Sequence, residues 1–212
     1  MTLPADKLIT INDRGARAAT TFGSLSAGGA NMVFIKKLTA SSSATLSFVD
    51  GASSVVLDNT YKEYLFTFNN IHAATDAAEF TFNMSVDTGS NYNVAKTTTS
   101  FYAYHKEDDS GAALAYDANL DLAQGTGFQI LMENLGNGND ENGSGQLQIF
   151  SPSSTTFVKH FISRGMRNGS ADYSVDYHIA GYGNTTSAVD AIQFKMSSGN
   201  IDAGDICLYG IL

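Results

Sequence analysis

The segment FTFNMSV, residues 80–86, decides the fold class because large apolar and small polar side chains alternate in it one by one. In an extended chain its apolar members all project from one side: Phe80, Phe82, Met84 and Val86. A period of two is the repeat of a β-strand, whereas a helix repeats every 3.6 residues. We therefore predict a strand that is buried on one face and solvated on the other.

The same alternation recurs through the body of the chain. It is clearest over residues 147–149, 173–179 and 192–196. Gly, Asn and Asp clusters separate such segments at residues 87–91, 108–111, 137–145, 168–170 and 200–204. Short strands between turns of this kind predict an all-β fold, an antiparallel β-sandwich of the jelly-roll type.

Helices and repeats contribute little to this sequence. A single helical turn is compatible with residues 186–190 and a short helix with residues 110–121, and neither would change the fold class. No internal repeat of fixed period occurs, which argues against propellers and solenoids.

The closing segment SGNIDAGDICLYGIL, residues 198–212, stays apolar to its last residue. Chain ends usually fray in water, so these side chains need cover. We predict that residues 205–209 form a strand inside the sandwich, paired antiparallel with residues 191–196 through a turn at 200–204. Burial of each Leu or Ile then contributes about 1.5–3 kcal/mol.

The chain divides into a flexible N-terminal arm, residues 1–30, and a β-sandwich domain, residues 31–212. The arm is rich in small residues and poor in core formers. The whole chain has 212 residues and a net charge of -9, yet its first 37 residues hold five basic and two acidic side chains, a charge of +3. The arm is therefore expected to meet a different partner from the rest, which carries -12.

Composition excludes several classes of function. An acidic chain with a pI near 4.7 lacks the clustered cations that nucleic-acid binding needs. No apolar run approaches the roughly 18 residues of a membrane helix, and residues 1–6 lack the pattern of a signal peptide, so we expect no membrane insertion. The lone Cys207 cannot form an intrachain disulfide and is expected to be a buried or half-buried thiol.

Metal ligation has one weak candidate, the loop 137–145. If Gly143 takes the sixth position of a calcium loop, the twelfth falls on Ile149, so the pattern fails and a polar hairpin loop is favoured. Asp140 and Glu141 are the best candidates if a hard cation binds. Residues 105–109 alternate faces and cannot converge on one ion, and the remaining histidines are isolated: His72, His160 and His178. We predict no metal site and no cofactor.

Catalytic patterns are equally weak. Ser144 lies in Gly-Ser-Gly without the spacing of a nucleophile elbow, and the glycine pair Gly125 and Gly127 is explained by a turn. No Asp or Glu stands out as half of a glycosidase pair, whose separation is invisible in sequence. We predict that the chain is not an enzyme and has no catalytic residues.

Tyrosines offer the remaining candidate binding surface: Tyr92, Tyr102, Tyr104, Tyr116, Tyr182 and Tyr209. Their rings combine an apolar face with a hydroxyl and could stack on sugars. The chain has no Trp, the usual strongest stacking residue, so core and subunit interface are favoured over glycan binding.

Four stretches of the body resemble a family of small β-rich virion proteins of marine tailed bacteriophages. They are YNVAKTTTSFYAYHKE (92–107), LAQGTGFQI (122–130), SPSSTTFVKHF (151–161) and the C-terminal AGYGNTTSAVDAIQFKMSSGNIDAGDICLYGIL (180–212). The resemblance spans residues 44–212 and is weaker in the first 40 residues.

This resemblance implies a non-enzymatic structural protein that decorates the phage head or forms part of a tail appendage. Its partners would be other capsid or tail proteins, and its location the virion, assembled in the host bacterial cytoplasm. A homo-oligomer is expected, with a trimer favoured, and the arm is expected to anchor the body to the particle. The alternative is a carbohydrate- or receptor-binding module of a tail fibre that contacts a host-surface glycan. A glycan-cleaving enzyme is the third possibility.

Overall fold

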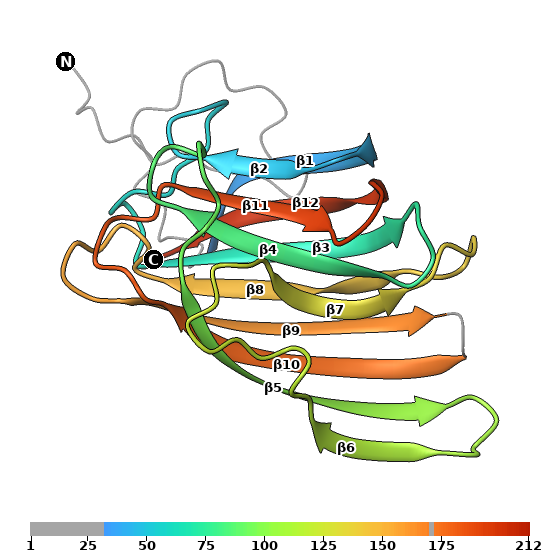
Figure 1. Ribbon diagram of the computed structural model, residues 1–212. Coiled ribbons are helices and arrows are strands. Elements are labelled where there is room, and N and C mark those ends of the chain that lie inside the picture. Colours follow the sequence, from blue (N-terminus) through green and yellow to red (C-terminus); the bar gives the residue numbers. More distant parts are fainter. Residues whose placement is uncertain (1–31, 170–171) are drawn as a thin grey trace, which may run out of the picture. The chain divides into compact units, whose positions relative to one another are not determined.

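The computed structural model describes residues 32–169 and 172–212, which form two antiparallel β-sheets packed face to face (Figure 1). The eight-stranded sheet has the order β1 (Met32–Ser43), β12 (Ile201–Ile211), β3 (Glu63–Ala73), β8 (Gly143–Phe150), β9 (Lys159–Gly169), β10 (Tyr173–Gly183), β5 (Lys96–Lys106) and β6 (Ala112–Tyr116). The four-stranded sheet has the order β2 (Leu46–Val49), β11 (Ala191–Met196), β4 (Ala78–Ser85) and β7 (Gln129–Leu135).

The predicted all-β sandwich is confirmed. Within residues 32–169 and 172–212 no helix is long and apolar enough to cross a membrane. The short helices considered at 110–121 and 186–190 are wrong: the first region contains strand β6 and the second is an irregular connection. The arm predicted for residues 1–30 lies outside the described residues.

The core between the sheets is built around Phe194 of β11, which is fully buried. Five phenylalanine rings surround it with centroid distances of 5.3 to 6.4 Å: Phe48, Phe66, Phe68, Phe80 and Phe82. They come from β2, β3 and β4, so the cluster joins strands from both sheets. Such aromatic contacts add to the area that the rings bury.

The closing segment is an internal strand, as predicted, but its partner differs from the expected one. β12 lies between β1 and β3 in the eight-stranded sheet, where Ile206 and Leu208 are fully buried. The expected pairing with residues 191–196 is wrong, because β11 belongs to the four-stranded sheet. The segment 197–200, which joins β11 to β12, therefore crosses from the four-stranded sheet to the eight-stranded sheet instead of forming a hairpin. Cys207 is buried in β12.

Strand β4 departs from its prediction on one face. Phe80, Phe82 and Met84 are buried as predicted, but Thr81, Asn83 and Ser85 are buried as well, and Val86, predicted on the buried face, lies beyond the end of β4 and is exposed. Asn83 Nδ2 donates to the carbonyls of Tyr92 (2.6 Å) and Thr126 (3.0 Å), so connecting segments cover the face that was expected to meet water. The hydrogen bonds offset the cost of burying this amide.

The two sheets have different widths, and this difference positions the candidate sites. β7 forms one edge of the four-stranded sheet and contacts β9 and β10 of the larger sheet. Strands β5 and β6 continue the larger sheet beyond that edge (Figure 1). Part of the larger sheet is therefore left without a covering layer on either side.

Candidate functional site

The first candidate site is the outer face, by which we mean the side of β8, β9, β10, β5 and β6 turned away from the four-stranded sheet. Ten large hydrophobic side chains are exposed in the described part of the chain, and five of them lie on this face. They are Phe101, Leu114, Tyr116, Ile162 and Met166. Exposed apolar side chains scattered singly need no explanation, whereas several on one face make that face a candidate interaction surface.

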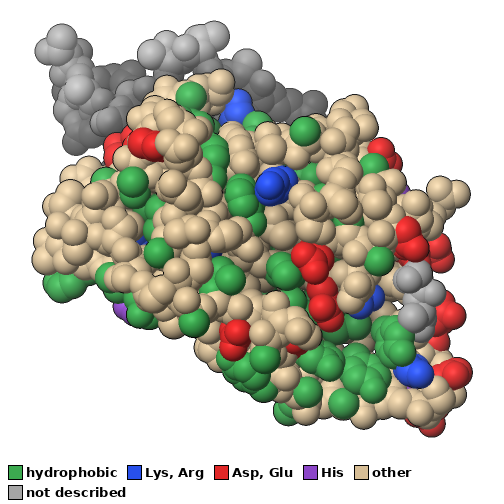
Figure 2. All heavy atoms as spheres, in the orientation of Figure 1, with side chains coloured by type: hydrophobic (Ala, Val, Ile, Leu, Met, Phe, Trp, Pro, Cys, Tyr) green, Lys and Arg blue, Asp and Glu red, His purple; other side chains and the backbone are tan. Residues whose placement is uncertain are grey.

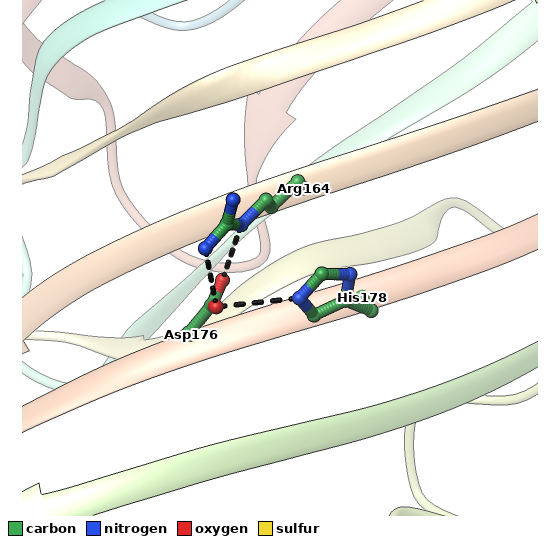
Figure 3. A network of polar contacts seen from close by, with 3 residues as sticks. All are labelled: Arg164, Asp176 and His178. Atoms are coloured by element: carbon green, nitrogen blue, oxygen red, sulfur yellow. Dashed lines mark hydrogen bonds and ion pairs between the residues drawn. The ribbon is translucent and has the colours of Figure 1, made fainter.

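An ion pair lies at the centre of the outer face (Figure 3). Arg164 of β9 donates from Nε to Asp176 Oδ1 at 3.0 Å and from Nη2 to Oδ2 at 2.9 Å. His178 Nε2 lies 3.2 Å from the same Oδ2, and its ring stacks on Phe101 at a centroid distance of 4.8 Å. The Arg164 guanidinium is the main cause of a lowered pKa at Asp176. A bidentate pair of this kind is held in one geometry.

A shallow apolar groove runs along the same face. It has a volume of about 560 Å³ and is lined by Phe150, His160, Ile162, Ala180 and Tyr182, among others. These side chains come from β8, β9 and β10, and the small residue Ala180 leaves the groove open. The outer face thus has both protruding rings, at Phe101 and Tyr116, and a hollow.

The second candidate site, the tyrosine pocket, lies on the opposite side of β5 and β10, beyond the edge of the four-stranded sheet. Hydrophobic side chains gather over this region in Figure 2. The pocket holds about 230 Å³ and is lined by Tyr102, Tyr104, Glu133, Arg167, Tyr173, Val175 and Tyr177. Glu133 comes from the edge strand β7, so both sheets contribute to the pocket.

The rings of the pocket contact one another closely. Tyr102 and Tyr104 lie 6.2 Å apart at 23° between planes, and Tyr173 meets Tyr104 edge-on at 5.3 Å. Lys106 Nζ lies 5.2 Å from the centroid of Tyr173, a cation–π geometry. These contacts hold the half-buried rings in fixed positions.

Polar groups line the base and the edge of the pocket. Arg167 Nε donates to the Tyr177 hydroxyl at 3.3 Å. Burial raises the pKa of Tyr177 to about 12 and also raises the pKa of the Glu133 carboxyl. The pocket therefore combines a desolvated carboxyl, a guanidinium and phenol groups, which are the groups that orient hydroxyl-rich ligands.

Two lysines are buried outside both sites. Lys96 Nζ, fully buried, donates to Asn83 Oδ1 at 2.5 Å and to the Val94 carbonyl at 2.7 Å, and burial lowers its pKa to about 7. Lys159 Nζ donates to three backbone carbonyls at 2.6 to 3.1 Å, and burial lowers its pKa as well. Both ammonium groups are satisfied by neutral oxygens. No sequence signal distinguished them from surface lysines.

The hairpin loop predicted at 137–145 is wrong: residues 136–142 connect β7 to β8, residues 143–145 already belong to β8, and the two strands lie in different sheets. Glu141 Oε2 accepts from the Gly138 amide at 2.6 Å, and the Asp140 carbonyl accepts from Asn168 Nδ2 at 2.8 Å. Glu141 therefore closes its own loop. The described residues contain no cluster of three or more His, Cys, Asp or Glu side chains arranged to hold a metal.

The other sequence candidates are dispersed. His105 lies one residue before the end of β5 and contacts Asp109 of the exposed turn at 3.1 Å, while His160 and His178 lie on the outer face. His72 pairs with Asp202 at 3.3 Å, and Ser144 accepts from the Asn70 amide. Gly125 forms a β-bridge with Lys96, consistent with a structural role.

The tyrosine candidates divide between the two sites. Tyr102 and Tyr104 line the tyrosine pocket, whereas Tyr116 and Tyr182 lie on the outer face. Tyr209 of β12 packs on Phe34 of β1 with ring centroids 5.7 Å apart, and in the strand order these two strands are far from both candidate sites. Tyr92 contacts the turn at Gly89. Tyr173 and Tyr177 were not among the candidate tyrosines: the alternation over residues 173–179 places them on one face of a strand but does not indicate their part in the pocket.

Comparison with known proteins adds no relative: no protein-family model, no curated protein and no solved structure matches this chain.

Proposed function

We propose that this chain is a non-enzymatic structural protein of a bacteriophage particle that decorates the head or forms part of a tail appendage. The observation that carries this proposal is the strand order. Without the pairs β5–β6 and β9–β10, two four-stranded sheets remain, β1-β12-β3-β8 and β2-β11-β4-β7. We infer from this order a jelly roll with two inserted hairpins. Jelly rolls of eight strands are typical of viral capsid and lectin domains.

Three further features support the proposal. The body resembles small β-rich phage virion proteins in the four stretches quoted above. The outer face has the character of a protein–protein interface, with aromatic and Met side chains around one ion pair. The basic-leaning N-terminal arm would anchor the body to an acidic neighbour in the particle.

Purified phage particles test this role. We expect this chain to co-purify with intact particles through a density gradient and to be located on their surface by electron cryomicroscopy. A copy number that matches the capsid lattice would indicate head decoration, and a small multiple of three or six would indicate a tail appendage. Absence of the chain from infectious particles would contradict the proposal.

A carbohydrate- or receptor-binding module of a tail fibre is the second candidate function, and the tyrosine pocket favours it. Its fixed rings and its Glu133 and Arg167 side chains suit a hydroxyl-rich ligand. We would titrate the protein with polysaccharide from the host surface. Tyr104→Ala should abolish the heat of binding, while Tyr116→Ala, on the other side of the sheet, should leave it unchanged. No binding by the wild type would contradict this candidate.

A further inference from the structure

We propose that the outer face pairs two copies of this chain, face to face, which makes the homo-oligomer a dimer in place of the trimer favoured from the sequence. The first reason is an inverted polarity in β9. Ser163 and Gly165 point into the sandwich, whereas Ile162 and Met166 point outward and are 53% and 54% exposed. A strand with one solvated face normally shows the opposite pattern.

The inversion has a local cause on the inner side. A Cβ on Gly165 would lie 2.7 Å from Met132 Cγ, so Met132 of β7 already fills the space beneath β9. Small residues are therefore required inside. The packing on the inner side of β9 does not explain why Ile162 and Met166, on its outer side, are large and apolar. An apolar partner surface that covers them would explain it.

Charge identifies the partner. The whole chain carries a net charge of -9, so two copies repel one another in most orientations. Among the described outward-facing residues of β8, β9, β10, β5 and β6, the only Lys, Arg, Asp or Glu side chains are Arg164 and Asp176, and these neutralise each other. The centre of this face is therefore neutral on an acidic protein, with carboxylates at its borders, where Asp121 accepts from the Tyr116 hydroxyl and Glu63 from Gln148 Nε2. A second copy can approach this centre without like-charge repulsion.

Shape and area agree with this partner. Each of β9, β10 and β5 has 11 residues, so at about 3.3 Å per residue and about 4.8 Å between strands they cover roughly 500 Å². Strands β8 and β6 extend this to roughly 700 Å², close to the roughly 800 Å² per partner of a standard interface. A two-fold axis that passes between Phe101 and Ala180 would place the Phe101 ring of each copy against the groove beside Ala180 of the other.

The test is sedimentation equilibrium of the full chain over a range of concentrations. We expect a wild-type dimer. Ile162→Arg should raise the dissociation constant of the dimer at least about a hundredfold. Because the dimer has two-fold symmetry, the substitution adds two like charges to the interface, one from each copy. The matched control is Val86→Arg, which alters an exposed apolar residue next to the four-stranded sheet and should leave the dimer intact. Circular dichroism melting curves would show that the variants fold.

A second variant tests the charge argument separately. Arg164→Glu leaves two carboxylates on each copy and should also dissociate the dimer, with recovery as salt is raised because screening weakens the repulsion. A wild-type monomer or trimer, or a dimer unchanged by Ile162→Arg, would overturn the inference. The dimer does not depend on the proposed virion role. Dimerisation is measured with the purified protein, whereas the virion role is tested with phage particles.

Discussion

The buried lysine Lys96 should make the free energy of unfolding rise with pH above neutrality. Burial lowers its pKa from 10.5 to about 7 in the folded chain, whereas the unfolded chain regains the ordinary value. Between these two pH values the unfolded chain holds a proton that the folded chain has released. Stability therefore rises with pH in this window, and below pH 7 the group contributes no further pH dependence.

The size of the effect follows from the shift. One pKa unit corresponds to about 1.4 kcal/mol, and Lys96 is only half-deprotonated at pH 7, so the expected gain from pH 7 to pH 9 is about 2 kcal/mol. We would measure urea unfolding of the wild type and Lys96→Met at pH 7, 8 and 9. Methionine keeps most of the side-chain length without a titrating group. The wild type should gain about 2 kcal/mol more across this range than Lys96→Met, which keeps only the contribution of Lys159, whose pKa burial also lowers.

The design includes a matched control and a bounded pH range. Lys62→Met changes an exposed lysine and should retain the wild-type pH dependence. Measurements stop at pH 9 because burial raises the pKa of Tyr64 and Tyr177 to about 12, and their titration acts in the opposite direction at higher pH. If Lys96→Met gains stability from pH 7 to pH 9 as the wild type does, the assignment of the effect to this lysine is refuted.

Three further outcomes are expected. Deleting residues 206–212 should abolish soluble folding, because it removes most of the strand that joins β1 to β3; an unchanged melting curve would contradict the internal position of β12. Phe194→Ala should lower the free energy of unfolding by about 3–5 kcal/mol in urea titrations, since it removes the ring that contacts five of the other six buried phenylalanines. Calcium should leave the melting temperature unchanged, because Glu141 already accepts the Gly138 amide; a clear rise would reopen the loop 137–145 as a cation site.

The fold class could be predicted from the sequence because alternation is a local signal. Tyr177 and Ile179 are buried at every second position of β10, as their spacing indicates. Partner strands could not be predicted equally well. Residues 191–196 and 205–209 are close in sequence and equally apolar, and nothing local shows that the chain crosses from one sheet to the other between them.

The buried lysines and the tyrosine pocket were missed for a related reason. Lys96 and Lys159 are both aligned with Gly183 of β10, and each donates to an acceptor outside its own strand, Lys96 to Asn83 Oδ1 and Lys159 to the Thr185 carbonyl. Glu133 reaches the tyrosines only because β7 ends the smaller sheet beside β10. Each arrangement depends on how two sheets overlap, which no single segment encodes.

The outer face could have been found from a signal that alternation analysis passes over. In the segment FISRGM, residues 161–166, the period of two continues but its polarity reverses after Phe161: Ser163 and Gly165 take the inner positions while Ile162 and Met166 take the outer ones. Alternation identifies which residues share a face, but not which face is covered. When the small residues of a strand point into a filled core and large apolar ones point out, the strand has apolar surface left exposed, which favours a partner from outside the fold.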